Sequence, residues 1–121
     1  MMSRLLIQLT CGPEEPTKAA LAFLLGKIAV EAGHDVTLFL VGEGVQLIRK
    51  ACRDSVVGVG TGPVGDHYAG FVAGGGNICL STLSSRARGV TDADLADTPA
   101  RFVFPQDLLQ LILDSDKVVT Y

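Results

Sequence analysis

Short apolar runs alternate along the chain with segments whose apolar residues recur at helical spacing. The apolar runs are residues 3–10, 35–42, 77–81, 100–104 and 117–121. The helix-like segments are residues 17–32, 42–53, 64–73 and 105–115. Each run is short enough for a strand, and 35–42 is almost continuously apolar, as in a strand covered on both faces. The alternation predicts an α/β fold with a parallel sheet between two layers of helices.

Turn and cap residues predict where several helices begin and end. Gly33 is well placed to end the helix at 17–32, which has apolar residues at positions 21, 24, 25 and 28. The triple glycine at 74–76 is expected to close a helix before a strand. Thr91, with Asp94 three residues later, predicts a short capped helix, and Pro105 suits a first helical position. Residues 81–90 are expected to form a mobile basic loop.

Length and charge restrict the class of protein. The 121 residues form a single domain, and 48% of them are hydrophobic, which predicts a large buried sheet or an oligomer interface. A net charge of −3 gives no basic field for a phosphate backbone, so nucleic acid is not an expected partner. No apolar run approaches membrane-spanning length and no signal peptide is evident, so we expect a cytoplasmic protein without membrane contact.

The three cysteines are Cys11, Cys52 and Cys79, without a Cys-x-x-Cys spacing. This pattern predicts neither a disulfide framework nor a metal site, so any functional thiol acts singly. Cys79 has two interpretations. Nearby arginines favour a reactive thiolate, whereas its place in an apolar strand favours a small buried residue.

The carboxyl ends of parallel strands are the usual ligand edge of an α/β sheet. The loops expected there carry Cys11, Glu43, Arg86 and Arg88, so a thiol, a carboxylate and two cations are candidates for one binding site. A nucleotide site at residues 42–45 lacks the glycine spacing and the lysine of phosphate loops. No cofactor is expected.

Two blocks carry a resemblance to a known family. The segment EAGHDVTLFLVGEGV and the cysteine of NIC followed by RGV resemble the DsrE/DsrF-like family of small sulfur-relay proteins. The resemblance spans nearly the whole chain and is weakest between Asp54 and His67. It implies a flavodoxin-like sheet of about five strands in a three-layer α/β/α domain over residues 1–121, assembled as homotrimers or hexamers.

The resemblance also implies a chemistry. Active members carry a persulfide on one cysteine and pass its sulfur to a partner thiol, which assigns Cys79 as the catalytic residue and predicts sulfur-donor and sulfur-acceptor proteins. Cys79 stands about two residues further from Arg88 and Gly89 than the family's cysteine does. Either this loop has an insertion, or Ser81 occupies the cysteine position. The alternative function is a non-catalytic binding or assembly subunit of the same fold.

Overall fold

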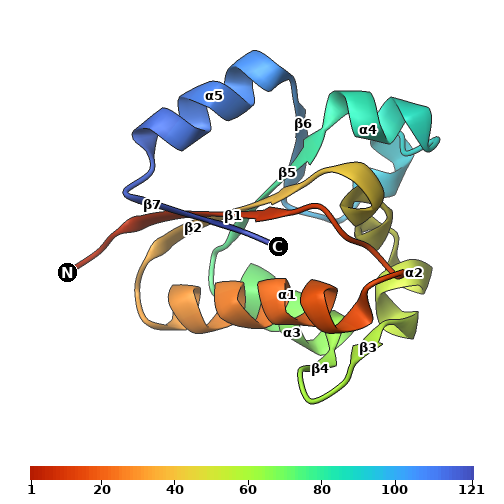
Figure 1. Cartoon of the computed structure of the whole chain (residues 1–121), viewed down its shortest axis with the longest axis horizontal. Helices are drawn as coiled ribbons and strands as arrows, with labels where there is room; N and C mark the ends of the chain where they lie inside the picture. Colours follow the sequence, from red (N-terminus) through yellow and green to blue (C-terminus); the bar gives the residue numbers. More distant parts are fainter.

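A parallel sheet of five strands lies between two layers of helices in the computed structural model, which describes residues 1–121 (Figure 1). The strands follow the order β6-β5-β2-β1-β7. They are β1 (Arg4–Leu9), β2 (Asp35–Leu40), β5 (Asn77–Ser81), β6 (Ala100–Val103) and β7 (Lys117–Thr120). The helices are α1 (Pro16–Glu31), α2 (Lys50–Ser55), α3 (Val64–Ala73), α4 (Thr82–Ala87) and α5 (Pro105–Asp114), with 3-10 helices η1 (Gly42–Ile48) and η2 (Asp92–Leu95). The predicted fold class is confirmed.

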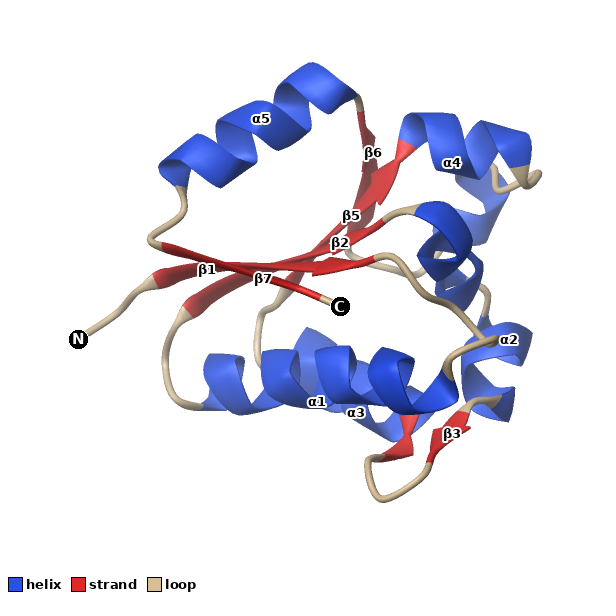
Figure 2. Ribbon diagram, in the orientation of Figure 1, coloured by secondary structure: helices blue, strands red, loops and turns tan.

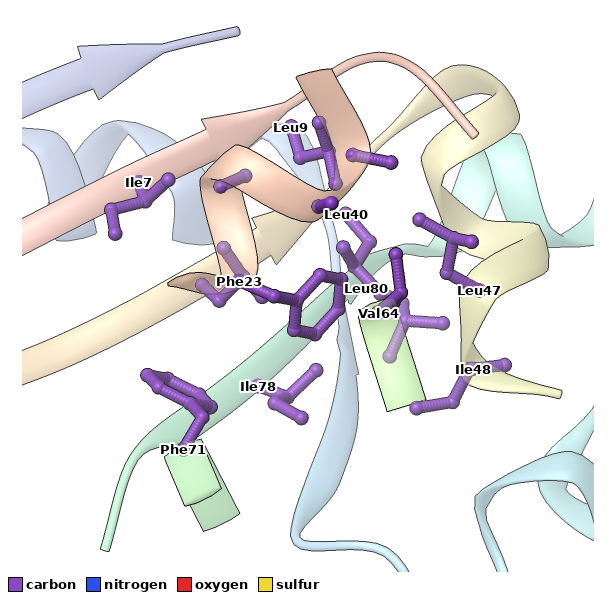
Figure 3. Close-up of a cluster of buried hydrophobic side chains, with 14 of the residues drawn as sticks. Ile7, Leu9, Phe23, Leu40, Leu47, Ile48, Val64, Phe71, Ile78 and Leu80 are labelled. Carbon is purple, nitrogen blue, oxygen red and sulfur yellow. The ribbon is translucent and has the colours of Figure 1, made fainter. Parts of the chain in front are cut away.

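The larger core lies between the sheet and the layer of α1 and α3 (Figure 2). Alternate strand residues such as Ile7, Leu40 and Ile78 point into it, where they meet Phe23 of α1 and Phe71 of α3 (Figure 3). Side chains of a strand alternate between faces, so each central strand contributes half of its residues to this core. Both faces are covered, which is why 35–42 is apolar at nearly every position.

The face that α1 buries does not follow its apolar positions 21, 24, 25 and 28. The buried residues are Ala19, Ala20, Ala22, Phe23, Gly26, Ala29 and Val30, whereas Ile28 is 53% exposed. The helix is apolar nearly all round, so helical spacing could not distinguish its faces. Small residues on α1 determine instead how it packs against α3. A Cβ added at Gly26 would lie 3.0 Å from the Phe71 ring, so α1 and α3 approach closely there.

The opposite face holds a much smaller core under α5. Leu6, Phe39, Cys79 and Val103 form it, with Leu108 and Leu111 of α5 packed against them. No residue of α5 is itself buried. Pro105 starts this helix as predicted, but several apolar residues that recur at helical spacing along it are exposed, with Leu109 at 57% and Leu113 at 68%.

The predicted helix ends are confirmed where a residue has to adopt a particular backbone conformation or to cap the helix. Gly33 and Gly75 adopt positive φ directly after α1 and α3, and Thr91 forms the expected capping box with Asp94. Two predictions need correction. Residues 82–87 are helical rather than a loop, because Ser81 caps them, and residues 42–53 form η1 and α2 with Arg49 extended between them. Residues 57–63, which had no clear pattern, form the antiparallel pair β3 (Val57–Gly58) and β4 (Gly62–Pro63).

Candidate functional site

The candidate site lies where β1, β2 and β5 end, because all three strands run parallel and finish at one edge. The loop after β1, the helix η1 after β2 and the helix α4 after β5 meet at this edge. Gly42 has a φ of +58°, and a Cβ at Gly44 would lie 2.6 Å from the carbonyl oxygen of Leu9. The two glycines therefore allow η1 to turn sharply against the end of β1.

An ion pair joins two of the residues expected at this edge. Arg88 Nε donates to Glu43 Oε1 at 2.7 Å, and Arg88 Nη1 donates to the Ser84 carbonyl at 3.2 Å. The pair is partly exposed, with 28% of the Arg88 side chain and 46% of the Glu43 side chain accessible. Each charge is thus largely neutralised by the other, and neither faces the edge as a free ion.

Two serines connect the same elements through backbone hydrogen bonds. The Ser81 hydroxyl oxygen accepts from the Ser84 amide at 3.1 Å, which caps α4. The Ser84 hydroxyl oxygen accepts from the Gly42 amide at 2.9 Å, which holds η1 against α4. Because each hydroxyl oxygen already accepts a fixed N–H, its own proton is free to be donated elsewhere.

A cavity of about 300 Å³ opens between this edge and α5. Its polar lining comes from Gln8 of β1 and from the Ser81 and Ser84 hydroxyls. Its other lining residues are Phe39, Val41, Leu83, Val103, Phe104, Pro105 and Leu108. No charged side chain lines it. Gln8 and Ser84 could not be recognised from the sequence, because a lone polar residue at a strand end and one serine among several carry no recognisable motif.

Cys79 lies outside this cavity. Its side chain is 0% exposed and packs in the small core with Leu6, Phe39 and Val103. Ser81 follows two residues later on the same face of β5, so the serine, rather than the thiol, stands at the end of the strand. Burial raises the pKa of the Cys79 thiol.

The cation that acts on Cys79 is one the sequence analysis did not name. Arg101 is paired with Cys79 in the register of β5 and β6, and its charge offsets part of the rise in the thiol pKa, while Asp107 adds to it. Arg86 lies instead over the Phe104 ring at 5.5 Å and lines a separate hollow beside β6.

Cys11 does not approach Cys79 either. It is half-buried and packs against the larger core, while Cys79 belongs to the core on the other face of the sheet. Its sulfur lies 3.7 Å from the Thr10 hydroxyl oxygen. Of the residues expected to converge, only Glu43 and Arg88 are in contact.

No three His, Cys, Asp or Glu side chains are grouped so that they could hold a metal ion. None of the helices has both the length and the apolarity needed to cross a membrane.

Comparison with known proteins agrees with this architecture. The family model for the DsrE/DsrF-like family matches residues 3–121. The chain belongs to this family. The crystal structure of the YchN protein from E. coli superposes on this DsrE/DsrF-like chain with a TM-score of 0.80, covering 100% of both chains at 19% sequence identity. Because that identity is low, the likeness establishes a shared fold. The chain has no match among curated proteins.

Proposed function

We propose that this DsrE/DsrF-like protein is a binding subunit that holds a small ligand in the cavity at the carboxyl ends of β1, β2 and β5, without carrying a persulfide. The observation that supports this most directly is that hydroxyl groups, and no thiol, line the cavity. Ser81 and Ser84 line the cavity, whereas the Cys79 side chain is 0% exposed.

Sulfur relay requires two properties of a cysteine, and the position of Cys79 favours neither of them. The sulfur must be reached by a donor and an acceptor thiol, and it must ionise to attack. Cys79 is covered by α5, and burial raises the pKa of its thiol, so the neutral form predominates near neutral pH. A buried neutral thiol behaves as a small apolar residue.

The relay on Cys79 remains the second candidate, and one observation favours it. The layer above Cys79 is thin, because α5 has no buried residue and contributes only Leu108 and Leu111 to the small core. Displacement of this helix would bring the thiol to the surface beside Arg101. Family membership is in keeping with this role as well as with the first.

The exposed apolar residues of α5 support an oligomer. Leu109, Ile112 and Leu113 are exposed on the helix, and Val118 of β7 is 44% exposed. Isolated apolar side chains are common on protein surfaces, but several on one helix mark a contact surface. We propose that a second copy of the chain covers α5, in line with the homotrimers or hexamers that the family implies.

The decisive experiment compares the three cysteines of the native protein. The purified chain is treated with inorganic polysulfide, and separately with iodoacetamide, and the modified cysteine is located by peptide mass mapping. We expect Cys79 to stay unmodified in the folded protein and to react fully in urea. Cys11 and Cys52 serve as internal controls, because both are half-buried rather than sealed.

Sulfur on Cys79 of the folded protein would overturn the binding-subunit proposal and establish the relay candidate. A Cys79→Ala variant is the matched control in that case, because it removes the thiol without enlarging the side chain. Loss of the added sulfur mass in this variant would locate the persulfide.

A further inference from the structure

We infer that the cavity between the strand ends and α5 selects an uncharged, mostly apolar ligand that presents a hydrogen-bond acceptor at its inner end. The inference rests on the proposed binding function and adds to it the chemical class of the ligand. It follows from three properties of the cavity: the absence of charge, the donors that remain unused, and the size.

The absence of charge is the first property. Every side chain that lines the cavity is neutral. Three cations lie near the cavity without lining it: Arg88 pairs with Glu43 at 2.7 Å, Arg86 lies over the ring of Phe104, and Arg101 lines a separate hollow. An ion entering an apolar cavity loses its hydration without finding a counter-charge, which is strongly unfavourable. The cavity therefore discriminates against carboxylates, phosphates and ammonium groups.

The unused donors are the second property. The Ser81 and Ser84 hydroxyl oxygens accept backbone N–H groups, and neither hydroxyl donates to another protein atom. The Gln8 side chain makes no hydrogen bond within the chain and is half-buried. A ligand oxygen of the carbonyl type satisfies these donors, and the amide oxygen of Gln8 can accept from an adjacent N–H.

Size and surface give the third property. The volume of about 300 Å³ is at the lower end of the range for small-ligand pockets. It corresponds to roughly ten non-hydrogen atoms if each occupies about the volume share of one water molecule. Leu83 at 55% exposure and Phe104 at 39% exposure stand at the boundary of the cavity with solvent. Covering them favours an apolar body on the ligand.

Three probes of similar shape and different charge test the inference: benzamide, benzoate and benzylamine. Each is titrated into nitrogen-15-labelled protein, and the backbone amide signals of Gly42 and Ser84 and the side-chain amide signals of Gln8 are followed by NMR. We expect saturable shifts with benzamide, and dissociation constants at least ~10-fold higher for the two charged probes.

Variants locate the binding. Ser84→Ala removes one donor and is expected to weaken benzamide binding by about 3-fold to 10-fold. Leu83→Ala removes an apolar side chain that is already more than half exposed, so the fold is preserved and binding weakens by about 2-fold to 5-fold. Ser55→Ala, which removes an exposed hydroxyl on α2, is the matched control and should bind as the parent does.

Three results would overturn the inference: benzoate or benzylamine binding as tightly as benzamide, no saturable shift with any probe, or unchanged affinity in both Ser84→Ala and Leu83→Ala. The polysulfide experiment is independent of these titrations. An unmodified Cys79 combined with a preference for benzoate would refute the ligand class and leave the binding function standing. Sulfur on Cys79 would refute the proposal that the subunit carries no persulfide, and the titrations alone would then decide the ligand class.

Discussion

Arg88 Nε and Glu43 Oε1 lie 2.7 Å apart, and this ion pair joins the residue after α4 to the start of η1. Because both side chains are partly exposed, Glu43→Gln is expected to lower the free energy of unfolding by no more than about 1 kcal/mol. The loss should shrink at high salt, which screens exposed charges. Urea unfolding at low and high salt measures both effects. A large loss that salt does not change would mean that the pair is effectively buried.

Neighbouring serines of α4 are expected to respond oppositely to replacement by alanine. The Ser85 hydroxyl oxygen is buried without a hydrogen-bond partner, so Ser85→Ala should be neutral or raise the free energy of unfolding by up to about 1 kcal/mol. Ser84→Ala removes the acceptor of the Gly42 amide and should lower it by about 1 kcal/mol. Thermal and urea unfolding of the two variants in parallel give the comparison. If the two variants lose the same free energy of unfolding, the Ser85 hydroxyl has a hydrogen-bond partner in solution.

Titration of Cys79 should make stability depend on pH in the alkaline range. Burial raises the pKa of this thiol above the ordinary 9.0, so the folded chain holds the proton more tightly than the unfolded chain does. The resulting stabilisation is complete below the unfolded pKa and is lost as the pH rises through the folded pKa. The free energy of unfolding, measured with urea between about pH 7 and 10.5, should therefore fall above about pH 9.

The variant Cys79→Val isolates the contribution of the thiol, because valine fills a similar volume and does not titrate. Its free energy of unfolding should fall less steeply with pH than that of the parent. Some decline should persist, since burial also raises the pKa values of Cys52 and Tyr68. An unchanged slope in Cys79→Val would show that the thiol is not the group responsible.

Arg53 is a buried cation that holds α2 against α3. Its guanidinium carbon lies 3.8 Å from the centre of the Tyr68 ring, and Nη1 donates to the Ile48 carbonyl at 2.6 Å. Arg53→Met keeps the apolar stem and removes the charge, which should cost about 2–4 kcal/mol of unfolding free energy.

The same variant should change the titration of Tyr68. Burial raises the Tyr68 pKa, and the charge of Arg53 offsets part of that rise. The pKa should therefore increase further in Arg53→Met, as ultraviolet absorbance of the phenolate would record. Tyr121 is the other tyrosine of the chain, so a Tyr121→Phe background assigns the signal. A lower Tyr68 pKa in Arg53→Met would contradict the placement of the Arg53 charge over the Tyr68 ring.

The apolar surface of α5 is expected to hold copies of the chain together. Leu113 is 68% exposed in the single chain, so Leu113→Glu should leave the fold intact and reduce the oligomer size. Sedimentation velocity measures the assembly, and circular dichroism checks the fold. Gln106→Glu, which adds the same charge near the other end of the helix, should keep the parent assembly. Identical sedimentation of parent and Leu113→Glu would contradict an interface on α5.

The sequence predicted the main strands and most helices because their signals are local. Continuous apolar runs marked the strands, and Gly33, Pro105 and the Thr91 capping box marked helix ends through backbone requirements. The buried face of α1 could not be identified from the sequence, because nearly every residue of that helix is apolar. The helix at 82–87 was missed as well, since its hydroxyl-rich sequence is equally typical of a turn until Ser81 is known to cap it.

The sequence by itself determined an α/β domain of the DsrE/DsrF-like family and placed Cys79, Glu43, Arg86 and Arg88 near the ends of strands. Tertiary structure decided which of these side chains face one another. Glu43 and Arg88 pair, Arg86 turns to Phe104, and Cys79 is sealed beneath α5 while Ser81 reaches the cavity. The reason is geometric. Cys79 and Ser81 are two residues apart on β5, so their side chains share a face of the sheet. The packing of α5, which is distant in sequence, covers Cys79 and leaves Ser81 at the cavity.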